Sequence, residues 1–152
     1  MAVTLKTGDK APDFKLEDQD GKTIKLSDLE GKKSVIFFYP ADMTPTCTIE
    51  ACNLRDNHTI FQSKGYEVYG VSPDDAKSHQ KFIAKHQLPY TLLSDPDHKM
   101  AIAYGVWDEK QLFGRKYMGI VRTTLKKKKK GKIAEVITKV KSKDHASQIL
   151  KL

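Results

Sequence analysis

Cys47 and Cys52 are the only cysteines in the sequence, and both lie in the stretch YPADMTPTCTIEAC. A cysteine reacts as a nucleophile in its thiolate form, and the first turn of a helix lowers the pKa of a thiol through unpaired N–H groups and the helix dipole. Thr44 or Thr46 can cap a helix here, and the proline between them suits a first helical position. The pattern therefore predicts a reactive thiolate at Cys47.

The spacing of the two cysteines limits what they can do together. If both lie in one helix, their Cα atoms are about 8 to 9 Å apart, whereas a disulfide rarely tolerates more than about 6.8 Å. A disulfide between Cys47 and Cys52 would thus require part of the helix to unwind. Thiol-disulfide oxidoreductases use C-x-x-C, and a zinc site needs more ligands than this stretch offers. No metal or organic cofactor is implied.

The histidines show no ligand-like spacing with the cysteines, and we expect them to be surface or helix-face residues. They are His58, His79, His86, His98 and His145.

The elements around Cys47 follow from the hydrophobic pattern. Lys33 to Tyr39 reads KSVIFFY, which is typical of a strand buried on both faces. Pro40 ends this strand, and a helix is expected from about Thr46 to Ser63. Cys47 would therefore lie at a strand-to-helix corner, with Pro40 keeping the corner rigid and shielding it from water.

The rest of the chain predicts an α/β protein, with helices on both faces of a central mixed sheet. Between Gly105 and Gly119 the chain is Gly-rich, and no element is predicted there. The other expected elements are an N-terminal hairpin over Phe14–Leu26, strands over Tyr66–Ser72, Thr91–Leu93, Ile120–Leu125 and Ile133–Ile137, a helix through Phe82, Ile83 and His86, a short helix through Met100 and Ala103, and a helix from about His145.

Length and composition favour one domain over residues 1–152, with 39% hydrophobic and 30% charged residues. The first ten residues lack the apolar centre of a secretory signal, and no apolar run is long enough to cross a bilayer. We therefore expect a cytoplasmic protein. The net charge is +8, and the run Lys126 to Lys130 alone supplies five of these charges.

Several motifs together resemble the peroxiredoxin family. Pro40, Thr44 and Cys47 stand in its P-x-x-x-T-x-x-C arrangement, and Cys52 resembles the second cysteine of the peroxiredoxin Q branch, also called bacterioferritin comigratory protein. The resemblance continues through GDKAPDF, DGK, FFYP, ACNLRD, TLLSD, VRTT and YGVW, which extend over nearly the whole chain.

This resemblance implies a thioredoxin-like fold and a thiol-dependent peroxidase acting on hydrogen peroxide and organic hydroperoxides. Cys47 would be the peroxidatic cysteine and would be oxidised to a sulfenic acid. Cys52 would resolve it as an intramolecular disulfide, which a thioredoxin-type thiol donor reduces. Arg122 matches the active-site arginine of the family, and Thr44 would face the sulfur or a peroxide oxygen. The resemblance also implies a monomer.

Glu50 lies one helical turn after Cys47. At this distance its carboxylate can hydrogen-bond Arg122 or be solvated, and we favour the contact with Arg122.

The run of five lysines departs from the family pattern, which continues after VRTT with an apolar strand and an acidic turn. Lys126 and Lys127 fall where buried side chains are expected, unless the strand is at an edge and their stems snorkel to solvent. The run is a basic patch, a frayed solvated strand end, or an error in the sequence. We favour the error because a homopolymer interrupts an otherwise regular pattern, and intact mass decides the question.

Two rival functions remain. A nucleic-acid-binding module would rest on the lysine run alone, so we expect no nucleic-acid partner. A thiol-disulfide oxidoreductase would need the C-x-x-C spacing that Cys47 and Cys52 lack.

Overall fold

The computed structural model describes residues 5–151, except for the side chain of Leu112. Seven strands of this part of the chain form the central sheet, in the order β2-β1-β5-β4-β3-β8-β9. Their bounds are β1 Lys15–Glu17, β2 Thr23–Lys25, β3 Lys33–Phe38, β4 Tyr66–Ser72, β5 Thr91–Ser94, β8 Thr123–Lys127 and β9 Ile133–Ile137.

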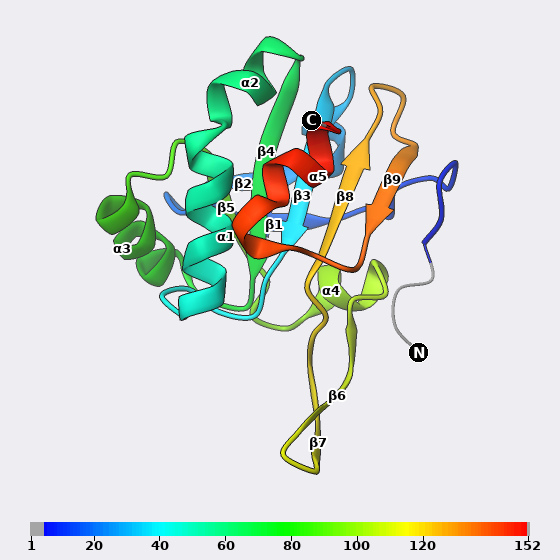
Figure 1. Cartoon of the computed structure of the whole chain (residues 1–152). Coiled ribbons are helices and arrows are strands. Elements are labelled where there is room, and N and C mark those ends of the chain that lie inside the picture. The colour runs from blue at the N-terminus through cyan, green and yellow to red at the C-terminus, as the bar shows by residue number, and fades with distance from the viewer. Residues whose placement is uncertain (1–4, 152) are drawn as a thin grey trace.

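The sheet is mixed, as the sequence predicts (Figure 1). The strands β3, β4 and β5 run parallel, whereas β8 pairs antiparallel with β3, and β9 pairs antiparallel with β8. At the other edge, β1 and β2 form the expected N-terminal hairpin, in which Leu16 faces Ile24. The strand β3 lies in the interior of the sheet, and its last five residues are all buried.

Helices cover both faces of the sheet. Their bounds are α1 Pro45–Asp56, α2 His58–Ser63, α3 Ala76–His86, α4 Lys99–Ala103 and α5 His145–Leu150, with 3-10 helices at Leu26–Leu29 and Ser142–Asp144. One buried cluster joins the sheet to α1, α2, α3 and α5, and a second joins the opposite face to α4 and the N-terminal segment. No helix within residues 5–151 has the length and apolar character needed to span a membrane.

The helix expected over Thr46–Ser63 is in fact two helices, so this prediction is wrong at Asn57. There φ is −110° and ψ is 11°, which interrupts the helical backbone between α1 and α2. The Asn57 side chain donates to the carbonyl of Asn53 at 2.8 Å, the acceptor that its own N–H would use in a continuous helix. Asparagine side chains compete with the backbone in this way, and the competition ends α1.

The Gly-rich stretch forms a hairpin that the sequence analysis missed. Strands β6 (Trp107–Leu112) and β7 (Arg115–Ile120) pair antiparallel as a separate sheet and project from the body of the molecule (Figure 1). Phe113 and Gly114 form the turn with φ values of 51° and 77°, which fits a two-residue type I′ turn. The strand expected over Ile120–Leu125 is therefore wrong at its start: β7 ends at Ile120, and Val121 and Arg122 form a connection to β8.

The structure also corrects the description of the lysine run. Lys126 and Lys127 lie in β8, which has β3 on one side and β9 on the other, so this strand is neither an edge nor frayed. Lys127 is 1% exposed, and its ammonium donates to the carbonyls of Leu29, Lys32 and Lys128 at 2.9, 3.0 and 3.1 Å.

Three acceptors satisfy the three N–H donors of the Lys127 ammonium, so the group is buried with its hydrogen bonds complete. Burial still lowers the pKa of Lys127, and the nearby carboxylates oppose this only partly. The Lys126 ammonium donates to the Ile149 carbonyl at 2.8 Å, and the remaining lysines, Lys128 to Lys130, are exposed.

Candidate active site

A short loop connects β3 to α1 and places Cys47 in the first turn of the helix. Thr44 is the N-cap residue, with φ −80° and ψ 151°, and Pro45 is the first helical residue. The Thr44 side chain makes no capping hydrogen bond; its hydroxyl donates to the carbonyl of Ala41 at 3.0 Å. Thr44 therefore leaves the N–H groups of the first turn, including that of Cys47, for other partners. Pro40 is half-buried at the start of this loop.

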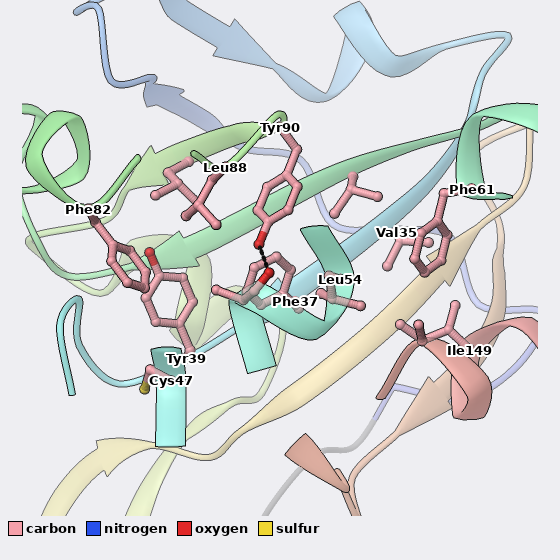
Figure 2. Packing of buried hydrophobic residues seen from close by; sticks show 14 of the residues in the cluster. Val35, Phe37, Tyr39, Cys47, Leu54, Phe61, Phe82, Leu88, Tyr90 and Ile149 are labelled. Atoms are coloured by element: carbon pink, nitrogen blue, oxygen red, sulfur yellow. Dashed lines mark hydrogen bonds between the residues drawn. The ribbon is translucent and has the colours of Figure 1, made fainter. Parts of the chain in front are cut away.

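Cys47 lies at the edge of the buried cluster under α1 and is 2% exposed. Figure 2 shows Cys47 at one end of this cluster, near Tyr39, whose ring centroid lies 6.3 Å from that of Phe82. The buried surroundings of Cys47 in this cluster are therefore apolar and aromatic. The polar partner of the sulfur comes from another part of the chain.

That partner is Arg122, in the connection between β7 and β8. Its Nη2 donates to Cys47 Sγ at 3.3 Å, and its Nη1 donates to Glu50 Oε1 at 2.6 Å. The backbone on either side of Arg122 is fixed, because the Val121 N–H donates to Val106 O at 2.7 Å and Thr123 Oγ1 donates to Val121 O at 2.8 Å. One guanidinium thus joins the thiol to a carboxylate through its two ends, a geometry that lysine cannot reproduce.

Burial dominates the electrostatics of this cluster. Glu50 is fully buried, and burial raises its pKa to about 7 despite the opposing effect of Arg122. For Arg122, burial disfavours the charge, but Glu50 and Cys47 together outweigh it and raise the pKa of the guanidinium. Arg122 is therefore a permanent cation, while Glu50 can change its charge near neutral pH.

His145 extends the cluster, and the sequence analysis missed it. Its Nε2 lies 2.6 Å from Thr124 Oγ1 and 3.4 Å from Glu50 Oε2, and its Nδ1 lies 2.8 Å from Gln148 Oε1. The expectation that all five histidines are surface or helix-face residues is wrong here, because His145 and His79 are both fully buried. No sequence signal pairs His145 with Glu50, since the contact depends on how α5 packs against α1.

Cys52 lies on α1 with Cys47, half-buried, and both thiols are free. Residues five apart in a helix have Cα atoms about 8 to 9 Å apart. The helix therefore has to open before the two sulfurs can bond.

The sequence matches known proteins over nearly its whole length. Residues 7–136 match the model of the AhpC/TSA family. The chain belongs to this family. A relative from Bacillus subtilis, Peroxiredoxin Bcp, is 48% identical over 148 residues, covering 97% of this chain and 94% of the Bacillus protein.

Solved structures of similar peroxiredoxins have the same fold. Peroxidoxin BcpB of Mycobacterium tuberculosis is 37% identical with a TM-score of 0.85, covering 97% of this chain and 95% of the other. A structure of the Xanthomonas campestris bacterioferritin comigratory protein, described for its alkyl peroxide reduction activity, is 32% identical with a TM-score of 0.87, covering 98% and 95%.

These matches establish a thioredoxin-like peroxiredoxin of the Q branch, a thiol-dependent peroxidase. A peroxiredoxin takes a peroxide as substrate and a thiol as reductant.

Proposed function

We propose that Cys47 is the peroxidatic cysteine of this peroxiredoxin and that Arg122, Glu50, Thr44 and Pro40 form its surroundings. The observation that carries the proposal is the fork of Arg122, which contacts Cys47 Sγ at 3.3 Å and Glu50 Oε1 at 2.6 Å. A guanidinium at this distance stabilises a thiolate and the negative charge that develops on a departing oxygen.

The reaction begins with attack of the Cys47 thiolate on the terminal oxygen of the peroxide. A sulfur–oxygen bond forms as the oxygen–oxygen bond breaks, so the sulfur is oxidised to a sulfenic acid and the other oxygen leaves as water or an alcohol after taking up a proton. The first-turn N–H of Cys47 and the oxygen of Thr44 offer polar contacts to the two peroxide oxygens. Pro40 keeps the loop rigid and shields it from water.

The substrates in this proposal are hydrogen peroxide and organic hydroperoxides. Exposed apolar side chains close to Cys47 in the sequence are consistent with an organic group on the substrate: Met43, in the loop, is 42% exposed, and Ile49, in α1, is 40% exposed. The alkyl peroxide reduction described for the Xanthomonas relative is consistent with this substrate class.

Cys52 completes the cycle as the resolving cysteine. Its thiol condenses with the sulfenic acid of Cys47, which forms the disulfide and releases water. Because both residues lie within α1, this step requires local unfolding of the helix. A second peroxide that arrives before α1 opens would over-oxidise Cys47 to a sulfinic acid.

The remaining parts of the proposal concern partners and organisation. A thioredoxin-type protein reduces the disulfide, in a reducing compartment such as the cytoplasm. Residues 1–152 act as one domain and as a monomer, because both cysteines of the disulfide lie in one chain.

The test is peroxide consumption by the wild type and by Cys47→Ser, with dithiothreitol and then thioredoxin as reductant. We expect rapid turnover that the variant lacks; equal rates in the two proteins would refute the role of Cys47.

Non-reducing mass spectrometry after one equivalent of peroxide tests Cys52. A product without a Cys47–Cys52 linkage would exclude the proposed resolution step.

A further inference from the structure

Glu50 Oε2 is a buried carboxylate oxygen without a hydrogen-bond donor. The Glu50 side chain is 0% exposed, and this oxygen has no hydrogen-bond partner among the described residues. A buried polar atom left unsatisfied costs free energy. The nearest group that can exchange a proton with Oε2 is Nε2 of His145, at 3.4 Å.

The surroundings of His145 determine which of its nitrogens carries a hydrogen. Gln148 Nε2 donates to the Lys139 carbonyl at 2.9 Å, so Gln148 Oε1 is an acceptor, and it also receives the Lys141 N–H at 2.8 Å. His145 Nδ1, 2.8 Å from the same Oε1, must therefore be the donor of that contact. In a neutral imidazole, Nε2 then has a lone pair that faces Thr124 Oγ1 and Glu50 Oε2.

A lone pair on Nε2 and an ionised Oε2 would repel each other at this fully buried position. One proton between them removes the repulsion. If the proton is on Glu50, Nε2 accepts the Thr124 hydroxyl at 2.6 Å; if the proton is on His145, Nε2 donates to the Thr124 oxygen. Thr124 Oγ1 thus keeps its contact with Nε2 in both arrangements.

We propose that Glu50 and His145 together hold one proton while Cys47 is a thiolate, so that the charge of Arg122 stabilises the sulfur rather than cancelling a Glu50 carboxylate. This proposal rests on the proposed function of Cys47. His145 is a positioning residue in it: it does not touch the peroxide, and it acts through Glu50 and Arg122.

The charge count explains why the proton matters. Arg122 contributes +1 and the thiolate −1, and an ionised Glu50 beside a neutral His145 adds a second negative charge for the same guanidinium. With the proton in place, Arg122 and Cys47 balance. A thiol that ionises can pass its proton to the pair, and Arg122 then exchanges one ionic partner for the other without a change in the net charge of the site.

The other groups near the pair agree with this arrangement. Burial raises the pKa of Glu50 and lowers that of His145, and the charge of Arg122 lowers the pKa of His145 further, so the proton rests mainly on Glu50. Tyr90, directly before β5, lies near Glu50 but donates its hydroxyl to the Ala51 carbonyl at 2.7 Å (dashed line in Figure 2), and its raised pKa keeps it neutral.

A double-mutant cycle on alkylation of Cys47 by iodoacetamide tests the proposal. His145→Phe removes the lone pair that favours a protonated Glu50, so the variant should be alkylated about three- to tenfold more slowly at neutral pH, with the midpoint of its pH profile about 0.5 to 1 unit higher. Glu50→Gln fixes a neutral side chain at this position, so its alkylation rate is the reference for the second arm of the cycle. Adding His145→Phe to Glu50→Gln should then change nothing further.

The matched control is Ile149→Ala, which loosens the same helix α5 at a fully buried position and leaves both titratable groups of the pair in place. It should leave the pH profile unchanged. An equal slowing by His145→Phe in the Glu50→Gln background, or the same slowing by Ile149→Ala, would show a purely structural role and overturn the proposal.

A second measurement is made on the wild type and needs only one variant as a reference. The infrared spectrum of the reduced wild type at neutral pH should contain the carbonyl band of a protonated, buried carboxylic acid, and Glu50→Gln should lack it. A spectrum without this band, together with a ¹⁵N chemical shift showing an unprotonated His145 Nε2, would refute the shared proton. Neither experiment requires peroxide turnover, so failure of the proposed function would be seen separately.

Discussion

Two buried pairs of a histidine and a carboxylate flank the start of α1, and they differ in how well they are satisfied. Asp42 Oδ2 lies 2.7 Å from His79 Nδ1 and also accepts the Ser78 hydroxyl at 2.8 Å, while its Oδ1 accepts the Tyr39 hydroxyl at 2.6 Å. Glu50 Oε2 lies 3.4 Å from His145 Nε2 and has no hydrogen bond among the described residues.

The first pair has every side-chain polar atom in contact with a partner. His79 Nε2 lies 3.0 Å from the Leu93 carbonyl, and His79 Nδ1 lies against Asp42. This pair ties the loop before Cys47 to α3 and β5. In the second pair, Glu50 Oε2 has no hydrogen bond among the described residues, and Glu50 can gain or lose a proton near neutral pH.

The difference shows how one site can be both rigid and responsive. A saturated buried network holds its shape because every change leaves a polar group unpaired. A network that contains an unpaired acceptor can exchange a proton at little structural cost. The loop before Cys47 is held by the first kind of pair, and the charge around Cys47 depends on the second.

The largest effect should come from breaking the Asp42–His79 pair, whose polar atoms all have partners. His79→Phe leaves the Asp42 carboxylate buried without its imidazole partner, and we expect a loss of about 3–5 kcal/mol in the free energy of unfolding. Urea denaturation measures it, with His86→Phe, a half-buried position on the same helix, as the control. A loss below about 1 kcal/mol, as for an exposed ion pair, would mean that the two pairs do not differ as described.

Arg122→Lys should instead reduce activity while largely preserving stability. Lysine keeps the charge but cannot contact Cys47 and Glu50 with two ends at once, so we expect kcat/KM for hydrogen peroxide to fall about 10²-fold. Steady-state peroxide consumption measures this, and Arg115→Lys on the exposed hairpin provides the control. Wild-type kcat/KM in Arg122→Lys would argue against a role for the fork.

Lys127 is another buried charged group whose hydrogen bonds are complete. It tests whether such a group stabilises the folded protein. Lys127→Met removes the ammonium donor from the carbonyls of Leu29, Lys32 and Lys128, and we expect a loss of about 1–3 kcal/mol in unfolding free energy. The neighbouring exposed Lys128→Met should stay within about 0.5 kcal/mol of the wild type. Equal effects of the two substitutions in urea denaturation would contradict the buried position of Lys127.

The smallest expected effect is a pH dependence of the unfolding free energy that comes from Glu50. The pKa of Glu50 is about 7 in the folded protein and 4.5 as its ordinary value, so between these pH values the folded state binds more protons than the unfolded state. This contribution to stability is complete below about pH 4.5 and is lost as the pH rises through about 7.

Glu50→Gln should remove this slope. Relative to the wild type, the variant should therefore gain on the order of 1–3 kcal/mol in unfolding free energy between pH 5 and pH 8, as followed by urea denaturation at each pH. Parallel curves for the two proteins would show that Glu50 is already ionised at pH 5.

The sequence alone predicted much of this molecule. The apolar run of β3, the alternation of strands with helices and the position of Cys47 in the first turn of α1 follow from local patterns, because short-range sterics and burial specify them. The sequence also indicated two candidate site residues. A family motif pointed to Arg122, and the position one helical turn after Cys47 pointed to Glu50.

What the sequence could not determine depends on contacts between distant segments. The Asn57 break depends on a side chain that captures a backbone acceptor, and the β6–β7 hairpin has a Phe-Gly turn in place of a familiar turn pair. The burial of Lys127 was unexpected because three carbonyls from separate segments converge on its ammonium. The local sequence around Lys127 does not predict that these carbonyls meet at its ammonium.

The sequence by itself therefore predicted a reactive thiol at Cys47, in the first turn of a helix that begins with a proline. It also named Arg122 and Glu50 as candidate partners of this thiol. Only the tertiary structure brought α5 against α1 and placed His145 beside the unsatisfied oxygen of Glu50. The physical reason is that the exchange of a proton between two groups depends on their distance and on their burial, and packing determines both.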